Sequence, residues 1–229
     1  MKEAIVFDLD GTLVDSAPDI AAAANRMLDD FGHRPLPDPL LRSFIGHGIP
    51  QLVRKVIASL DLNPSLHPDW NARMLAQYSD RPAELTRPYP GVIVALETLA
   101  GAGHPLGLCT NKFHGLSMQV LEALDMDRLF QVVIGGDSLS VRKPDPAPLQ
   151  AAFAALPTPP LLYVGDSEVD AETAQAGGYR FALFTQGYRK TPVEELPHHV
   201  AFDRFDALQA IVNDCRSLRG KVISTRSAT

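Results

Sequence analysis

The sequence has few cysteines and no block of basic residues, and these shortages exclude several classes of protein. Its 229 residues include two cysteines, Cys109 and Cys215, which are too few for a disulfide framework and lack metal-ligand spacing. Lysine and arginine number 21 against 27 acidic residues, so the net charge of −6 does not favour nucleic-acid binding. We therefore expect a reducing compartment and no nucleic-acid partner.

No hydrophobic run in the sequence is long enough to cross a bilayer. The first apolar run begins at Ala4, which leaves no room for a signal peptide, so we expect a cytoplasmic protein with no membrane partner. The hydrophobic fraction of 45% is sufficient for a large core, and the length suits one domain that carries an insert. The sequence does not distinguish a monomer from a homodimer.

The most informative stretch lies near the start of the chain. Four apolar residues, 4–7, lead into Asp8-Leu9-Asp10-Gly11-Thr12. A short apolar run that ends in small and acidic residues predicts a buried parallel strand, and open α/β sheets carry their chemistry at the carboxyl ends of such strands. Two carboxylates with no positive neighbour are costly unless a cation or a proton neutralises them. This stretch therefore predicts a metal site.

Residues 16–86 have a helical pattern throughout. Ser16 or Asp19 is expected to cap a first helix that ends near Phe31. Apolar residues at helical spacing predict further helices, at 40–44, 49–60 and 68–78. Because this segment separates the first strand from the next strand and helix, it predicts an inserted helical cap rather than a linker.

The rest of the chain alternates short apolar runs with helical patterns, which predicts a parallel, doubly wound sheet. We expect an α/β, Rossmann-like core formed by residues 1–15 and 87–220, and a flexible tail at 221–229. The expected strands lie at 105–109, 132–137, 161–166 and 181–184, and the expected helices at 92–100, 116–124, 148–156, 169–176 and 205–218.

Polar residues follow four of the expected strands, and parallel strands bring such residues to one edge of the sheet. Carboxylates there can hold Mg²⁺, which prefers oxygen ligands. A lysine, a hydroxyl and a metal together can neutralise a phosphate dianion, so that a carboxylate can attack it. In chain order these residues are Asp8, Asp10, Thr110, Asn111, Lys143, Asp166 and Asp170.

These motifs resemble those of the haloacid dehalogenase-like hydrolases. Asp8-Leu9-Asp10-Gly11-Thr12-Leu13 is similar to the first motif of that superfamily. Thr110, Lys143 and Gly165-Asp166-x-x-x-Asp170 are similar to the second, third and fourth motifs, in the same order. The resemblance covers nearly the whole chain and implies a phosphoryl-transfer enzyme with a helical cap.

The resemblance implies a covalent mechanism. Asp8 would attack phosphorus and form an aspartyl-phosphate, and Asp10 would protonate the leaving oxygen and later activate water. An aspartate at position 10 favours a phosphatase or phosphomutase, since the dehalogenase branch lacks that acid.

The same resemblance implies a Mg²⁺ cofactor and a phosphate site. Asp8, Asp166 and the backbone carbonyl of Asp10 would hold the metal, with Asp170 supporting it directly or through a neighbouring ligand. The phosphoryl oxygens would be held by Thr110 and Lys143, together with backbone N–H groups near Leu9 and Asn111.

Within the superfamily the chain looks most similar to bacterial phosphoglycolate phosphatases, in residues 44–48, 105–112, 135–137 and 142–146. That likeness implies hydrolysis of 2-phosphoglycolate to glycolate and phosphate. The cap stretch Gly46-His47-Gly48 can approach a small substrate closely, and we expect its backbone N–H groups to meet the substrate carboxylate.

Other functions remain open at this point. The substrate could be another small phosphate, such as a sugar phosphate or pyrophosphate, and a β-phosphoglucomutase-like enzyme would return the phosphoryl group to a sugar. A phosphonate hydrolase would need a cap lysine, and Lys55 is the only lysine in the insert. A signalling receiver would carry its acid pair and its phosphorylated aspartate on different strands. A binding domain would not need both Asp8 and Asp10.

Overall fold

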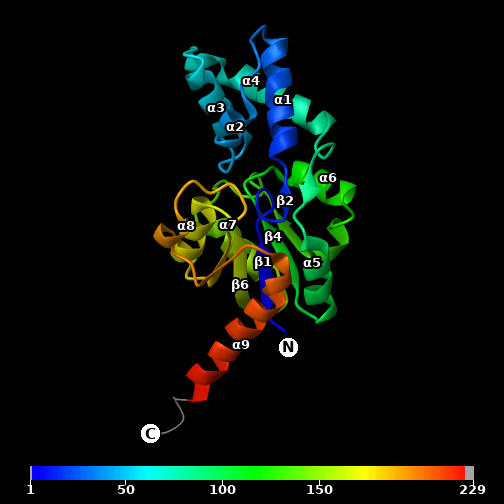
Figure 1. Ribbon diagram of the computed structural model, residues 1–229, viewed down its shortest axis with the longest axis vertical. Coiled ribbons are helices and arrows are strands. Elements are labelled where there is room, and N and C mark those ends of the chain that lie inside the picture. The colour runs from blue at the N-terminus through cyan, green and yellow to red at the C-terminus, as the bar shows by residue number, and fades with distance from the viewer. Residues whose placement is uncertain (1, 225–229) are drawn as a thin grey trace.

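The core of the protein is one parallel sheet of six strands in the order β5-β4-β1-β6-β7-β8 (Figure 1). The computed structural model describes residues 2–224. The expected α/β class is confirmed, and β8 is a strand that the sequence did not predict. The strands are β1 Ala4–Phe7, β4 Leu106–Cys109, β5 Val132–Ile134, β6 Pro160–Gly165, β7 Phe181–Phe184 and β8 Val200–Phe202.

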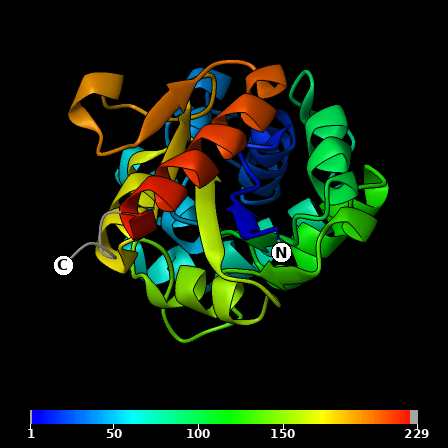
Figure 2. The ribbon, with the colours of Figure 1, turned by 90° about the horizontal axis from the view of Figure 1, so that it is seen from below.

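Helices cover both faces of the sheet (Figure 2). Ile5 and Phe7 of β1 pack in a cluster that includes side chains of α5, α6 and α9, whereas Ala4 and Val6 pack in another that includes side chains of α7 and α8. Successive strand residues point to opposite faces, so a strand buried on both sides is apolar throughout. These helices are α5 Val92–Gly101, α6 His114–Ala123, α7 Ala147–Ala154, α8 Glu168–Gly177 and α9 Leu208–Ser224.

The helices α1 to α4 form a separate layer above the sheet (Figure 1). They share a hydrophobic cluster that also includes Leu116 and Tyr188 of the core, and α3 contributes to it the buried stripe of Leu52, Val53, Val56 and Ile57. This arrangement fits the proposed inserted cap. Its helices are α1 Ala17–Asp30, α2 Asp38–Arg42, α3 Ile49–Ser59 and α4 His67–Asp80, and the single-turn 3₁₀ helices of the chain lie at Pro64–Leu66, Asp127–Leu129, Val193–Glu195 and Phe205–Ala207.

The chain crosses between the cap and the core at two neighbouring places. β2 (Val14–Asp15) leaves the core, β3 (Arg87–Pro88) returns to it, and the two strands pair antiparallel. The buried carboxylate of Asp19 accepts hydrogen bonds from the backbone N–H groups of Leu85 and Thr86 and, at 2.6 Å, from the Thr86 hydroxyl. These contacts tie the two crossings together.

The prediction that Ser16 or Asp19 caps α1 is wrong, because both side chains have partners elsewhere in the fold. Asp19 binds the returning segment, and the Ser16 hydroxyl donates to Asp10 at 2.5 Å. The hydroxyl oxygen of Tyr188 accepts hydrogen bonds from the backbone N–H groups of Ser16 and Ala17 at 2.8 and 3.0 Å. A residue 172 positions away in the sequence therefore accepts the hydrogen bonds of the free backbone N–H groups at the start of this helix.

The prediction of a flexible tail at 221–229 is wrong for its first four residues. Residues 221–224, expected to belong to a flexible tail, continue α9, and residues 225–229 lie outside the described residues. Among residues 2–224, no helix combines the length and the hydrophobicity that a bilayer crossing requires.

Candidate active site

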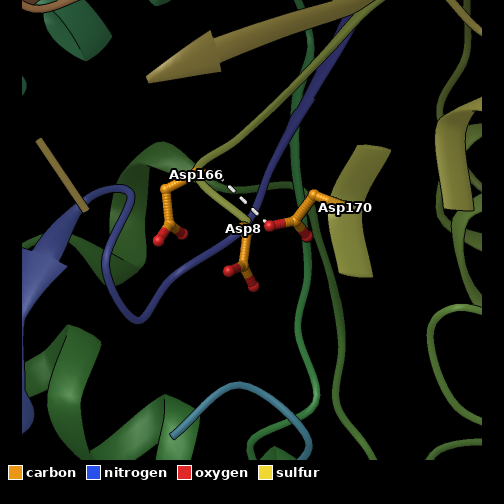
Figure 3. A group of neighbouring side chains, drawn as sticks. All are labelled: Asp8, Asp166 and Asp170. Carbon is orange, nitrogen blue, oxygen red and sulfur yellow. Dashed lines mark hydrogen bonds between the residues drawn. The ribbon is translucent and has the colours of Figure 1, made fainter. Parts of the chain in front are cut away.

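Three aspartates from two neighbouring strand ends gather at the edge of the sheet that faces the cap. Asp8 follows β1, and Asp166 and Asp170 follow β6, which pairs with β1. Carboxylate oxygens of the three residues lie within 4.8 Å of one another (Figure 3). All three are buried. The acids that the sequence predicts to converge therefore lie close together in the fold.

Two glycines allow this close approach. Gly11 has a φ of 88°, and a Cβ atom at this position would lie 2.5 Å from a carboxylate oxygen of Asp166. At Gly165, a Cβ atom would lie 2.5 Å from the Cβ atom of Asp170. A side chain at either position would push an acid out of the group, so the motifs need glycine there.

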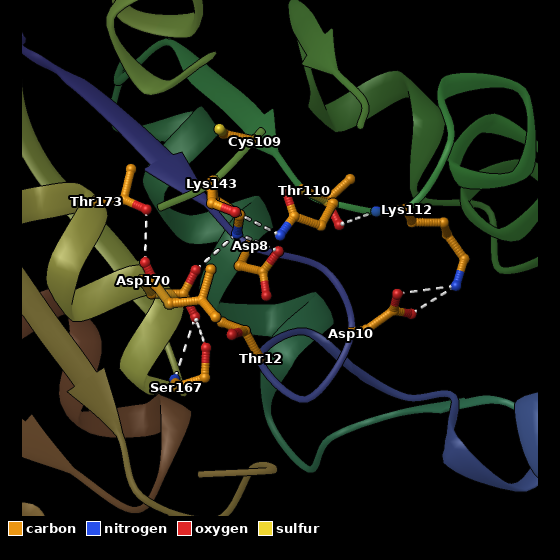
Figure 4. Close-up of polar contacts among 12 residues, drawn as sticks. Asp8, Asp10, Thr12, Cys109, Thr110, Lys112, Lys143, Ser167, Asp170 and Thr173 are labelled. Atoms are coloured by element: carbon orange, nitrogen blue, oxygen red, sulfur yellow. Dashed lines mark hydrogen bonds and ion pairs between the residues drawn. The ribbon is translucent and has the colours of Figure 1, made fainter. Parts of the chain in front are cut away.

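Lys143 is the buried cation that joins two of these acids. Its ammonium group donates to Asp8 at 2.8 Å, to Asp170 at 2.6 Å and to the Tyr163 hydroxyl at 2.8 Å (Figure 4). Burial alone would lower the pKa of Lys143, but the charges of Asp170 and Asp8 raise it above its ordinary value. Lys143 is therefore positively charged at neutral pH.

One lysine does not neutralise three buried acids. Burial raises the pKa of Asp8 to about 7, although Lys143 opposes the shift. Burial and the charges of Asp170 and Asp8 raise the pKa of Asp166 well above its usual range. For Asp170, burial is outweighed by the charge and hydrogen bonds of Lys143, which lower its pKa. An excess of clustered carboxylate oxygens suits a hard divalent cation such as Mg²⁺.

Fixed hydrogen bonds orient the two acids that follow β6. Thr12 donates to one oxygen of Asp166 at 2.8 Å, and the backbone N–H of Tyr188 donates to the other at 2.6 Å. Asp170 accepts hydrogen bonds from the backbone N–H and the hydroxyl of Ser167, which forms a capping box at the start of α8. Asp170 thus fixes the helix start and the Lys143 ammonium at once.

The carboxylate of Asp10 lies apart from the three-acid group. Lys112 donates to its two oxygens at 2.7 and 2.9 Å, and Ser16 to one of them. In Figure 4 this pair and the Asp8–Lys143 pair lie on either side of Thr110. The Asp10 side chain is therefore not one of the clustered carboxylates that could bind a metal. The predicted contact between the metal and the backbone carbonyl of Asp10 does not involve this side chain. Sequence reasoning did not identify Lys112, whose partner is 102 residues away.

Comparisons with known proteins find relatives of this chain over most of its length. The family model for haloacid dehalogenase-like hydrolases matches residues 5–184. The chain belongs to this family. A phosphoglycolate phosphatase from Cereibacter sphaeroides is 50% identical over 210 residues, which are 91% of this chain and 96% of that protein. The phosphoglycolate phosphatase of Rhodobacter capsulatus is 42% identical over 93% of this chain and 97% of its own length.

A solved structure is similar over the same length. A protein from Haemophilus somnus described as a predicted phosphoglycolate phosphatase superposes with a TM-score of 0.84 at 30% identity, covering 92% of this chain and 97% of that one. The predicted membership of the haloacid dehalogenase-like hydrolases is confirmed, and the protein is a hydrolase of that superfamily.

In this haloacid dehalogenase-like hydrolase, the loop after β4 holds the expected hydroxyl and amide. Thr110 is buried, and its hydroxyl oxygen accepts a hydrogen bond from the backbone N–H of Lys112 at 3.2 Å. The side-chain amide of Asn111 donates to the carbonyls of Gly46 and Lys143 at 3.2 and 3.0 Å. Asn111 therefore links a cap loop to the core, a contact that sequence reasoning did not foresee.

The pocket of this hydrolase lies between cap and core. Its core side includes all the predicted site residues of the core except Asp170, which stands behind Lys143. The cap side includes the expected Gly46-His47-Gly48 loop and the fully buried Tyr78. Burial and the nearby charges of Lys55 and Lys190 lower the pKa of His47. The residues that line the pocket include Asp8, Asp10, Thr110, Asn111, Lys112, Lys143 and Asp166.

Proposed function

We propose that this chain is a Mg²⁺-dependent phosphatase that hydrolyses 2-phosphoglycolate to glycolate and phosphate. The names of the relatives at 50% and 42% identity support the substrate. The buried Asp8 carboxylate beside Lys143, with the Asp10 carboxylate lining the same pocket, carries the chemical part of the proposal. A cytoplasmic location and a small phosphorylated metabolite as the partner belong to the same proposal.

In the first step, an oxygen of Asp8 attacks phosphorus while the bond between phosphorus and the glycolate oxygen breaks. Asp10 transfers its proton to that leaving oxygen, which departs as the glycolate hydroxyl. Lys143 neutralises charge on the phosphoryl oxygens, and the Thr110 hydroxyl donates to them. The product of this step is a phosphoryl group bound to Asp8.

In the second step, water attacks the phosphorus atom of the aspartyl-phosphate. Asp10, now a carboxylate, accepts the proton of the water as the new bond forms. The bond between phosphorus and the Asp8 oxygen breaks, which releases inorganic phosphate and restores Asp8. Lys112 and the Ser16 hydroxyl contact the Asp10 carboxyl group and hold it in place for both transfers.

The donor set fits a magnesium ion. Asp8, Asp166 and the backbone carbonyl of Asp10 would hold it, with Asp170 behind them fixed by Lys143 and Ser167. When bound, the ion supplies positive charge that offsets the phosphate dianion.

A substrate panel tests the proposed function. We expect kcat/KM for 2-phosphoglycolate to exceed that for pyrophosphate, glucose 6-phosphate, β-glucose 1-phosphate and a nucleoside monophosphate by at least about 10-fold. The measurement is phosphate release in Mg²⁺ buffer. Higher kcat/KM for any other member of the panel, or interconversion of sugar phosphates without phosphate release, would reject the assignment.

Magnesium should stabilise the protein more at higher pH. In the metal-free protein burial raises the pKa of Asp8 from its ordinary value of 3.8 to about 7, so the folded state binds a proton that the ion must displace. This proton stabilises the metal-free fold at low pH, and the contribution is lost as pH rises towards 7. We therefore expect the Mg²⁺-induced rise in Tm to be larger at about pH 7.5 than at about pH 5.5.

Differential scanning fluorimetry at both pH values measures this effect, with KCl of equal ionic strength as the control. The histidines are protonated to the same extent in samples with and without Mg²⁺ at one pH. Their effect on Tm therefore cancels in the Mg²⁺-induced rise in Tm. A rise in Tm that is the same at the two pH values would contradict the prediction.

A further inference from the structure

A lysine and a tyrosine from different parts of the fold meet beside Asp10. Lys112 follows β4 in the core, and its side chain is 3% exposed. Its ammonium group lies 4.7 Å from the centroid of the Tyr78 ring, which α4 of the cap provides. Both residues line the pocket that contains the Asp8 and Asp10 side chains. Neither Lys112 nor Tyr78 has a part in the mechanism as described so far beyond the ion pair that positions Asp10.

The pair holds hydrogen-bond donors that the protein itself does not use. An ammonium group has three N–H bonds, and the hydrogen bonds of Lys112 with ordinary distance and angle go to the two oxygens of Asp10, with Tyr78 as its further polar neighbour. The Tyr78 hydroxyl is fully buried and has no hydrogen-bond partner in the part of the chain that the structure describes. A buried hydroxyl without a partner costs stability, and a ligand that supplies an acceptor would remove that cost.

Of the lysines that line the pocket, Lys112 is the best placed to bind a negatively charged group of the substrate. In the described residues, the ammonium groups that line it are those of Lys112, Lys143 and Lys190. Lys143 is occupied by Asp8 and Asp170, and Lys190 is exposed at the rim. Lys112 is thus the buried ammonium group on the side of the pocket where Asp10 faces the leaving oxygen. The Gly46-His47-Gly48 loop can add backbone N–H groups there, but these groups carry no formal charge.

The chemistry of the proposed substrate places a second anion at the same point. In 2-phosphoglycolate a single methylene carbon separates the leaving oxygen from the carboxylate. If Asp10 contacts that oxygen, the carboxylate must lie next to Asp10, which is where the ammonium of Lys112 is held. We propose that Lys112 and Tyr78 form the subsite that binds the carboxylate of the substrate, with the ammonium and the hydroxyl both donating to it. This inference rests on the proposed function.

The first test compares two substrates with the same two-carbon chain. Ethyl phosphate has no carboxylate, so the ratio of kcat/KM for 2-phosphoglycolate to kcat/KM for ethyl phosphate measures recognition of that group. In Tyr78→Phe we expect kcat/KM for 2-phosphoglycolate to fall about 10- to 100-fold, mainly through KM, because a hydrogen bond to a charged group is lost. For ethyl phosphate we expect a change of less than about 3-fold.

The second test removes the charge. In Lys112→Met both substrates lose rate because Asp10 loses its partner, but the ratio should fall by about 100-fold or more. The Tm of Tyr78→Phe should equal or exceed that of the wild type, because the variant removes a hydroxyl without a partner. A merely structural tyrosine would instead lower Tm and leave KM unchanged, and that outcome would overturn the proposal.

Tyr179→Phe is the matched control, because Tyr179 packs against Phe153 and does not line the pocket. If the wild type prefers 2-phosphoglycolate, and Tyr78→Phe and Lys112→Met keep the wild-type ratio of the two kcat/KM values, the subsite alone is overturned. The same conclusion follows if this ratio falls in Lys190→Met and not in those two variants. A wild type with no preference for 2-phosphoglycolate over ethyl phosphate overturns the substrate assignment and the subsite with it. Selective loss in Tyr78→Phe and Lys112→Met, with an unchanged ratio in Tyr179→Phe, supports the subsite.

Discussion

The variant Asp8→Asn should lose at least about 10⁴-fold in kcat while it keeps the fold. The amide oxygen can still accept the hydrogen bond that Lys143 makes to Asp8 at 2.8 Å, so the local packing is retained. The amide does not provide the anionic oxygen that attacks phosphorus. Phosphate release from 2-phosphoglycolate measures the loss, and circular dichroism with thermal unfolding verifies the fold.

A covalent label distinguishes the loss of a nucleophile from a loss of binding. Wild-type protein that is quenched in acid during turnover of ³²P-labelled substrate should carry label on the peptide that contains Asp8, and Asp8→Asn should carry none. Asp203→Asn is the matched control, because Asp203 is exposed and does not line this pocket. Turnover by Asp8→Asn near the wild-type rate, or label on another residue, would exclude the covalent route.

The variant Lys143→Met should be both inactive and unstable. Loss of the Lys143 ammonium group leaves Asp8 and Asp170 buried without their shared cation, which lowers the free energy of unfolding by about 3–5 kcal/mol. Because the same ammonium neutralises the phosphoryl oxygens, kcat/KM should fall by about 10³-fold or more. Urea unfolding in EDTA gives the stability of the metal-free protein, and phosphate release in Mg²⁺ buffer gives the activity.

A double variant separates the two effects. In Lys143→Met/Asp170→Asn the excess buried charge is smaller, so we expect the unfolding free energy to recover by about 1–3 kcal/mol relative to Lys143→Met. Activity should stay lost, because no cation has been restored at the phosphate. Additive stability effects would contradict the coupling of Lys143 to Asp170, and activity that returns together with stability would show that Lys143 has only a structural part.

Much of the core could be predicted from the sequence because buried parallel strands are continuous apolar runs. The runs that became β1, β4, β5 and β6 were followed by the polar residues of the site, and strand order then brought Asp8 and Asp166 together. β8 escaped prediction because it has three residues, of which Ala201 is exposed, and follows a long loop at the sheet edge. β2 and β3 have two residues each, too few for a periodic pattern.

The remaining site contacts could not be predicted because they join residues that are distant in the chain. Lys112 looked like one more polar residue after a strand, and only the fold pairs it with Asp10. Tyr78 fitted the apolar face of a helix, which the buried ring occupies, but sequence spacing does not tell where a hydroxyl points. Asp19 had the local signal of a helix cap, and a tertiary partner at Thr86 outweighed it.

The paired crossings at β2 and β3 have a consequence for how such an enzyme can change over generations. Because the helical segment leaves and re-enters at adjacent points held by Asp19, its length and composition can vary without altering the spacing of the strand ends. The cap side of the surface that selects the leaving group, to which Tyr78 belongs, can therefore diverge while the core machinery that breaks the phosphorus–oxygen bond is kept. One set of catalytic acids can in this way acquire new substrates by exchange of a single modular insert.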